Sequence, residues 1–208
     1  MRFDDRLDAA RHLAQALRAY RGQHPLILAI PRGAVPMGRE LADLLQGDLD
    51  VVLVRKLHAP GDAEFAIGAL SETGQVVLMP WAEKAGADTH WIAQQRELES
   101  AKIRARRVRY TPLRPSLPVA GRTVIVVDDG LATGATMLAA LDALRLQRPA
   151  RLVCAVPVAS PDACTRVRAH CDELVCLSAP AQFASVGQFY RDFTQVEDAE
   201  VERVLAAS

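Results

Sequence analysis

The run VIVVDDGLATGATM, at residues 124–137, constrains the fold more than any other part of the chain. It places four apolar residues directly before two aspartates and a loop of small and hydroxyl-bearing residues. A short, uninterrupted apolar run is typical of a strand that is buried on both faces of a parallel sheet. Open α/β sheets bind their ligands at the carboxyl ends of such strands. The run therefore predicts a buried strand with a ligand site at its end.

The residue types after the strand predict the chemistry of that ligand. The carboxylates of Asp128 and Asp129 can accept hydrogen bonds from the vicinal hydroxyls of a ribose. The small residues Gly130, Gly134 and Ala135 let the backbone approach an oxyanion closely. Thr133 and Thr136 add hydroxyl donors. A plain turn would also suit Asp-Asp-Gly, but a turn does not call for the Thr-Gly-Ala-Thr continuation. The common triphosphate and dinucleotide motifs, Gly-x-x-x-x-Gly-Lys-Ser/Thr and Gly-x-Gly-x-x-Gly after a strand, are absent.

These residues resemble the signature of the type I phosphoribosyltransferase family, an apolar strand followed by two acids and a loop that ends in Thr-Gly-x-Thr. The resemblance implies a site for 5-phosphoribosyl 1-pyrophosphate (PRPP), with Asp128 and Asp129 on the ribose hydroxyls. It implies a 5-phosphate site made of Ala132, Thr133, Gly134, Ala135 and Thr136. It also implies a Mg2+ cofactor that has no direct protein ligand and is held through PRPP and water, near the two aspartates.

Two further segments resemble parts of the same family, in the expected order along the chain. Residues 26–30 form a short apolar run before Pro31, Arg32 and Gly33, which resemble the loop that holds the leaving pyrophosphate. An apolar strand over Asp50–Lys56 ends in the adjacent cations Arg55 and Lys56, which resemble a catalytic basic pair that neutralises the pyrophosphate. An ordinary Pro-Arg-Gly turn and a solvated strand end are the alternatives for the two segments.

The segment from His58 to Gly74 has too many small and turn-forming residues for one regular element, although residues 65–70 could form a strand. It resembles the family's mobile catalytic loop and hairpin. Members that act on 6-oxopurines typically carry an aspartate where this chain has Ala132, whereas adenine-type members carry alanine and supply a glutamate from a turn. Glu72 is therefore the candidate catalytic acid or base, with Glu64 as the second choice. A surface turn residue is the alternative for Glu72.

A basic helix is expected over residues 88–110, between a strand near residues 75–79 and the phosphate-loop strand. From residue 96 to residue 114, seven cations stand against Glu97 and Glu99: Arg96, Lys102, Arg104, Arg106, Arg107, Arg109 and Arg114. Three interpretations stay open for the helix. It is a solvated connection, an arm that lends an arginine to bound pyrophosphate here or in a dimer partner, or an RNA-binding face.

The whole chain alternates between strand and helix patterns, which predicts an α/β, Rossmann-like, doubly wound, mainly parallel five-stranded sheet with flanking helices. Its 208 residues, half of them apolar, fit a single phosphoribosyltransferase domain. A loop, hairpin and basic helical insertion at about 57–118 and a hood-like segment at about 180–208 complete it. Three of the five phenylalanines fall within residues 182–193, where Phe189 and Tyr190 are candidates for stacking on a base. Aromatic packing at the sheet edge is the alternative.

Composition narrows the class of protein. The formal net charge is zero and aromatic residues make up 5% of the chain, so a nucleic-acid surface is not indicated. The four cysteines lack metal-ligand spacing, and no apolar run reaches membrane-spanning length. Together with this composition, the resemblance to the phosphoribosyltransferase family implies a cytoplasmic, Mg-dependent transferase that joins PRPP to an unidentified base or other small acceptor, and a homodimer stays open. The alternative is a regulatory protein of the same fold that senses PRPP and binds RNA or a protein.

Overall fold

A sheet of five parallel strands forms the centre of the computed structural model, which describes residues 1–112 and 116–207 and, for residues 63 and 64, the backbone alone. The strands lie in the spatial order β2-β1-β6-β7-β8. Their bounds are β1 Leu26–Ala29, β2 Asp48–Val51, β6 Thr123–Val127, β7 Arg151–Val158 and β8 Glu173–Ser178. The predicted doubly wound sheet is confirmed.

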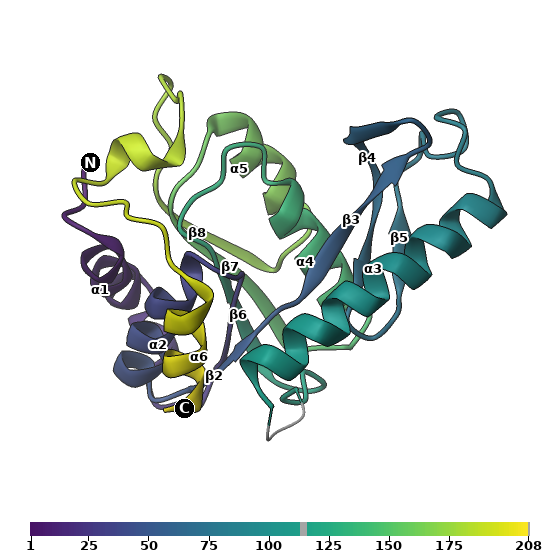
Figure 1. Cartoon of the computed structure of the whole chain (residues 1–208). Helices are drawn as coiled ribbons and strands as arrows, with labels where there is room; N and C mark the ends of the chain where they lie inside the picture. The colour runs from purple at the N-terminus through teal and green to yellow at the C-terminus, as the bar shows by residue number, and fades with distance from the viewer. Residues whose placement is uncertain (113–115, 208) are drawn as a thin grey trace.

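Helices cover both faces of this sheet (Figure 1). They are α1 Arg6–Ala16, α2 Ala34–Leu45, α4 Ala135–Arg145 and α5 Pro161–Arg168. Ile125 and Val127 of β6 pack into the core that contains α1 and α2, whereas Val124 and Val126 pack into the core that contains α4 and α5. Successive side chains of a strand point to opposite faces, so a strand covered on both faces must be apolar at every position.

Local capping residues set two of the helix starts. Asp5 accepts a hydrogen bond from the Asp8 N–H at 2.7 Å at the start of α1, and Ser160 accepts one from the Ala163 N–H at 3.1 Å at the start of α5. Pro161 occupies the first turn of α5, where its missing N–H costs nothing. Both capping groups lie next to their helices in the sequence.

A second, smaller sheet has three antiparallel strands in the order β3-β4-β5. The bounds are β3 Val54–Ala59, β4 Asp62–Ser71 and β5 Val76–Leu78. The prediction of a single strand over Asp50–Lys56 is wrong, because the chain leaves the parallel sheet after Val51 and starts a new strand at Val54. Val52 and Leu53 are buried in between, so the apolar run continues across the break and does not reveal it.

The segment from residue 58 to residue 74, expected as a loop and hairpin with a possible strand over residues 65–70, is mostly regular. β4 spans ten residues and pairs with both β3 and β5, with register shifts beside His58. A Cβ atom at Gly68 would lie 2.5 Å from the Val77 carbonyl oxygen of β5. The small residues that suggested a loop therefore allow a close approach of neighbouring strands.

The long helix α3, Thr89–Tyr110, runs beside the small sheet toward the C-terminal helix α6, Asp198–Ala206 (Figure 1). Asp88 caps it by accepting a hydrogen bond from the Trp91 N–H at 2.7 Å. The predicted helix over residues 88–110 is confirmed. On the other side, α4 contacts both sheets, so the small sheet is held between α3 and α4.

The C-terminal segment returns to the N-terminus before it ends in α6. A short 3-10 helix, Val186–Phe189, precedes a parallel bridge between Phe3 and Tyr190. The four cysteines are free thiols. Within the described ranges, no helix is both long enough and apolar enough to cross a membrane.

Candidate functional site

The strand order of the large sheet reverses between β1 and β6, and the two predicted ligand loops leave the sheet at this point. Ala29 of β1 lies in register with Val127 of β6. A Cβ atom at Gly33 would lie 2.1 Å from Oδ2 of Asp129, so only glycine permits this approach of the loops. The loops after residues 30 and 128 therefore converge, as expected for a doubly wound sheet.

Asp128 and Asp129 occupy the carboxyl end of β6 in a partly buried position. The Asp129 N–H donates to Oδ1 of Asp128 at 2.9 Å. Burial raises the pKa of Asp128 well above its ordinary value, and the negative charge of Asp129 raises it further. Burial also raises the pKa of Asp129, although Arg6 opposes that shift. Hydrogen-bond donors and cations beside this pair are therefore favoured.

Arg6 of α1 is a site residue that the sequence analysis missed. Its Nε and Nη2 atoms each lie 3.0 Å from Oδ2 of Asp129, and its Nη1 donates to the Thr194 carbonyl oxygen at 2.7 Å. Its guanidinium carbon lies 3.9 Å from the centre of the Phe193 ring. Arg6 is thus a positioning residue for Asp129. No local pattern could have revealed it, because 123 positions separate the two residues.

The predicted 5-phosphate loop leads directly into α4. Ala132 and Thr133 are exposed, and the Ser160 hydroxyl donates to the Ala132 carbonyl oxygen at 2.7 Å. Gly134 caps α4 with a φ of 73°, a left-handed conformation that glycine adopts without strain. The N–H groups of the first helical turn have no partner within the helix, and the helix dipole favours an anion there. The loop can therefore hold a phosphate.

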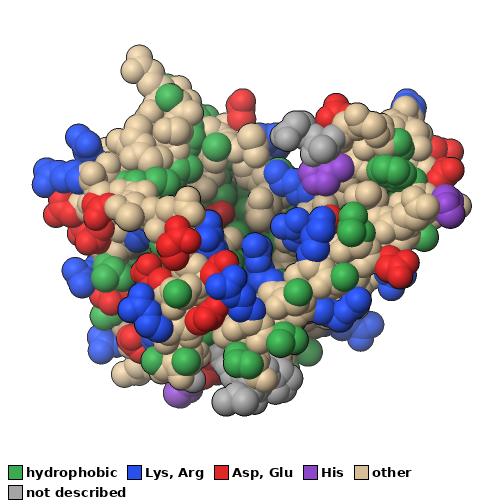
Figure 2. All heavy atoms as spheres, viewed as in Figure 1, with side chains coloured by type: hydrophobic (Ala, Val, Ile, Leu, Met, Phe, Trp, Pro, Cys, Tyr) green, Lys and Arg blue, Asp and Glu red, His purple; other side chains and the backbone are tan. Residues whose placement is uncertain are grey.

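A cavity of about 280 Å3 joins several predicted site residues from different elements. Its lining residues are Pro31, Val54, Arg55, Lys56, His58, Arg106, Thr136 and Ala139. Figure 2 shows lysine and arginine side chains gathered around a hollow between the two halves of the molecule. The cavity combines three cations with no carboxylate, which suits a strongly anionic ligand.

Two of the predicted pyrophosphate residues do not point into this cavity. Arg32 extends instead toward the C-terminal helix, where its Nη1 donates to Oε2 of Glu197 at 3.3 Å. Gly33 caps α2 and contacts Asp129, as described above. Of the predicted loop, Pro31 alone lines the cavity.

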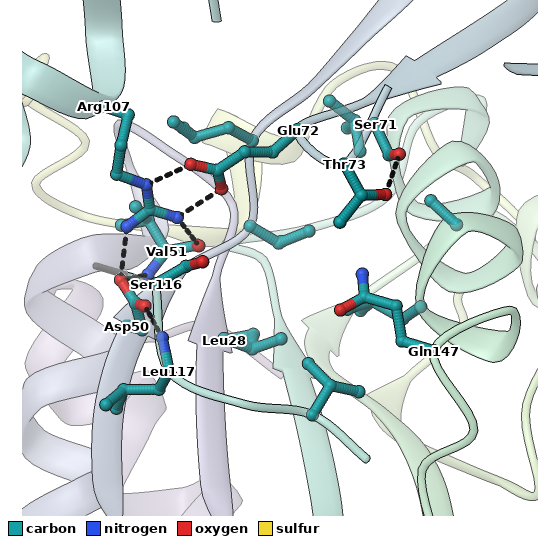
Figure 3. A pocket seen from close by; sticks show the side chains of 16 residues that line it. Leu28, Asp50, Val51, Ser71, Glu72, Thr73, Arg107, Ser116, Leu117 and Gln147 are labelled. Atoms are coloured by element: carbon teal, nitrogen blue, oxygen red, sulfur yellow. Dashed lines mark hydrogen bonds and ion pairs between the residues drawn. The ribbon is translucent and has the colours of Figure 1, made fainter. Parts of the chain in front are cut away.

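Glu72, the candidate catalytic acid or base, pairs with an arginine of α3. Both of its carboxylate oxygens accept hydrogen bonds from Arg107, at 2.5 and 2.6 Å. Arg107 also donates to Oδ1 of Asp50 at 2.7 Å and to the Val51 carbonyl oxygen at 3.0 Å. Figure 3 shows this cluster in a cavity that neither Arg55 nor Lys56 lines. Glu72 therefore fastens the small sheet to the large one, and the side chain of Glu64 lies outside the described part of the chain.

Tyr190, a candidate for stacking on a base, is buried in the structure. Its side chain is buried between Phe3 and Phe193, and its hydroxyl donates to the Asp129 carbonyl oxygen at 2.6 Å. Burial raises its pKa, with a further contribution from the charge of Asp129. Phe189 packs at 5.4 Å on Phe183. The aromatic cluster thus packs the C-terminal segment against the N-terminus and supports the aspartate loop through the Tyr190 hydroxyl.

Half of the six cations of the basic helix α3 form ion pairs within the molecule. Lys102 pairs with Glu99 at 2.6 Å, and Arg109 pairs with Asp198 at 2.8 Å. Arg107 is neutralised by Asp50 and Glu72. Arg114 lies outside the described residues. These pairs favour the interpretation of α3 as a structural connection over that of an RNA-binding face.

Comparison with known proteins places this geometry in a family. The model of the phosphoribosyl transferase domain matches residues 3–194 of the chain. A Mycobacterium tuberculosis protein, named as a candidate phosphoribosyl transferase in two strains, is 42% identical over 203 residues. That match covers 96% of this chain and 45% of the other protein, so the chain spans about half the length of the curated relatives it matches.

A solved structure agrees with the fold along the whole chain. The crystal structure of TT1426 from Thermus thermophilus is 46% identical, with a TM-score of 0.91. The alignment covers 100% of this chain and 99% of that one. With the family match over residues 3–194, the chain belongs to the phosphoribosyl transferase domain family.

Proposed function

We propose that this chain transfers the 5-phosphoribosyl group of PRPP to a nitrogen of a base and releases pyrophosphate. The observation that carries the proposal is the meeting of the two loops at the reversal of strand order, beside a cavity with cations and no carboxylate. This arrangement offers separate places for the ribose, the 5-phosphate and the leaving group of one donor molecule.

The residues would divide the reaction between them. Asp128 and Asp129 accept hydrogen bonds from the ribose hydroxyls, and the first turn of α4 holds the 5-phosphate. The bond between C1 and the pyrophosphate oxygen breaks as the base nitrogen bonds to C1, and its electron pair passes to the pyrophosphate. Lys56 and Arg55 lie where that growing negative charge would be stabilised, which is commonly the largest contribution to catalysis.

Mg2+ would assist by neutralising oxygens of the donor. Among the described residues, no group of three or more His, Cys, Asp or Glu side chains could hold a metal ion. Magnesium favours oxygen ligands and keeps several waters, so the donor's own oxygens and water fit this site, with Asp128 and Asp129 nearby.

The identity of the base is the finer part of the proposal. Ala132 has no group that could exchange a proton with a base, and Glu72 is held by Arg107. We therefore favour an acceptor that does not require an acid at either position, which disfavours the 6-oxopurines. Rapid pyrophosphate release with hypoxanthine would contradict this part.

The test combines turnover with donor binding. Pyrophosphate release from PRPP and Mg2+ is measured with adenine, hypoxanthine, guanine, uracil and orotate. Asp129→Asn should weaken PRPP binding by about 10- to 100-fold in calorimetry, since it removes a charged hydrogen-bond acceptor. Asp142→Asn is the matched control, because Asp142 pairs with His170 away from the loops. Unchanged PRPP affinity in a folded Asp129→Asn variant would refute the ribose assignment.

A further inference from the structure

We propose that Arg106 of α3 is a direct ligand of the leaving pyrophosphate, so that the long helix beside the small sheet completes the donor site. The inference rests on the proposed function and adds to it a residue from outside both ligand loops. Arg106 lines the cavity of about 280 Å3 together with Pro31, Lys56 and Thr136.

A second cavity extends the same basic surface. It has a volume of about 180 Å3 and is lined by Leu53, Val54, Arg55, Lys102, Ile103 and Arg106. Arg55 and Arg106 line both cavities, so the two guanidinium groups border the same space. The repulsion between two neighbouring cations is offset when an anion lies between or beside them.

The acids of the structure neutralise one of these two arginines only. Arg55 pairs with Glu99 at 2.7 Å, and Lys102 pairs with the same carboxylate at 2.6 Å. Burial by itself would raise the pKa of Glu99, but its hydrogen bonds from Lys102 and Arg55 hold the pKa below its ordinary value. Glu99 therefore serves Arg55 and Lys102 as a permanent counter-charge.

Arg106 has no such partner among the described residues. Its guanidinium carbon lies 6.0 Å from the centre of the Tyr110 ring, and its positive charge contributes to the lowered pKa of Asp198 without forming an ion pair with it. Its neighbours along the helix differ, since Arg107 and Arg109 each pair with two carboxylates. Arg106 thus lines a cavity without a carboxylate and has no ion pair within the described ranges, whereas Arg107 and Arg109 are neutralised.

The helix backbone beside Arg106 is fixed in place. Arg107, the next residue, binds Asp50 and the Val51 carbonyl of the large sheet and Glu72 of the small sheet. His58 lines the same cavity, and its Nδ1 atom is buried and has no hydrogen-bond partner within the described structure. A planar guanidinium held at one end can pair with two phosphate oxygens at once, which a lysine cannot do.

Three variants of the whole chain test the inference, with inorganic pyrophosphate plus Mg2+ and ribose 5-phosphate as separate calorimetric probes. Arg106→Ala should weaken pyrophosphate binding by about 10- to 100-fold, as expected for a lost charged hydrogen bond, and leave ribose 5-phosphate binding unchanged. Arg106→Lys should recover part of the loss. Arg104→Ala removes an exposed arginine of the same helix that lines neither cavity, and should bind both probes like the unaltered chain.

Each other outcome overturns the assignment. Equal pyrophosphate affinity in Arg106→Ala and Arg104→Ala would mean that Arg106 affects pyrophosphate no more than any other positive charge on the helix does. A loss of both probes in Arg106→Ala would indicate a structural role. Failure of the unaltered chain to bind pyrophosphate also overturns it. The proposed function is judged separately by turnover: selective loss of pyrophosphate binding without turnover on any base would uphold Arg106 and reject the transferase activity.

Discussion

Different interactions stabilise the positions of the two sheets in this molecule. In the five-stranded sheet, every residue of β1 and residues 124–127 of β6 are buried and apolar. The three-stranded sheet is joined to the rest partly through charges, with Arg107 between Asp50 and Glu72 and Glu99 between Arg55 and Lys102. The large sheet therefore positions its loops by packing, and the small sheet depends in addition on ion pairs.

This difference matters because the donor site uses both regions. The aspartates and the 5-phosphate loop come from the packed sheet, whereas Arg55 and Lys56 come from β3 of the small sheet. Packing contributes a free energy that salt hardly changes, while a buried ion pair is favourable only as long as every partner is present. The two halves of the site should therefore respond differently to the same perturbations.

The largest effect is expected from Arg107→Ala. It leaves Asp50, which is 1% exposed, as a buried charge without its cation. Loss of one partner of a buried pair costs about 3–5 kcal/mol of unfolding free energy. Urea denaturation measures the change. Arg109→Ala is the control, because its pairs lie at the surface and are worth about 1 kcal/mol or less. Similar losses in both variants would mean that the buried cluster has no special weight.

An intermediate effect is expected in the packed sheet. Ile125→Val removes one methyl group from a fully buried position and should cost about 0.5–1.5 kcal/mol of unfolding free energy. Because no charge is involved, the cost should be the same in low salt and in high salt, in contrast to that of Arg109→Ala, which salt should screen. A strong salt dependence of the Ile125→Val difference would break the distinction between the sheets.

A third effect is confined to alkaline pH and concerns the contact between α3 and α6. Burial, and then a hydrogen bond to Asp198, raise the pKa of Tyr110 to about 12. The unfolded chain loses this proton near the ordinary value of about 10, so the contribution to stability is complete below that pH and is lost as the pH rises toward about 12. Difference absorbance titration against Tyr110→Phe measures it. Ionisation of Tyr110 at its ordinary pKa in the folded chain would contradict the expectation.

Local patterns explain which parts of the fold and site could be predicted. The strand, acids and phosphate loop of residues 124–137 are contiguous, and the caps at Asp88 and Ser160 lie next to their helices. The break after Val51 could not be seen, because buried residues continue through it. The roles of Arg6, Glu72 and Tyr190 depend on partners 123, 35 and 61 positions away, which only the folded chain brings near.

The close approach of Gly33 to Asp129 makes the residues tolerated at these two distant positions depend on each other. Any side chain at 33 would have to displace the carboxylate that Arg6 holds. Substitutions at the two positions should therefore be non-additive, and related sequences should change them together or not at all. Anyone who redesigns the first ligand loop has to shorten the acid of the second before adding a single methyl group.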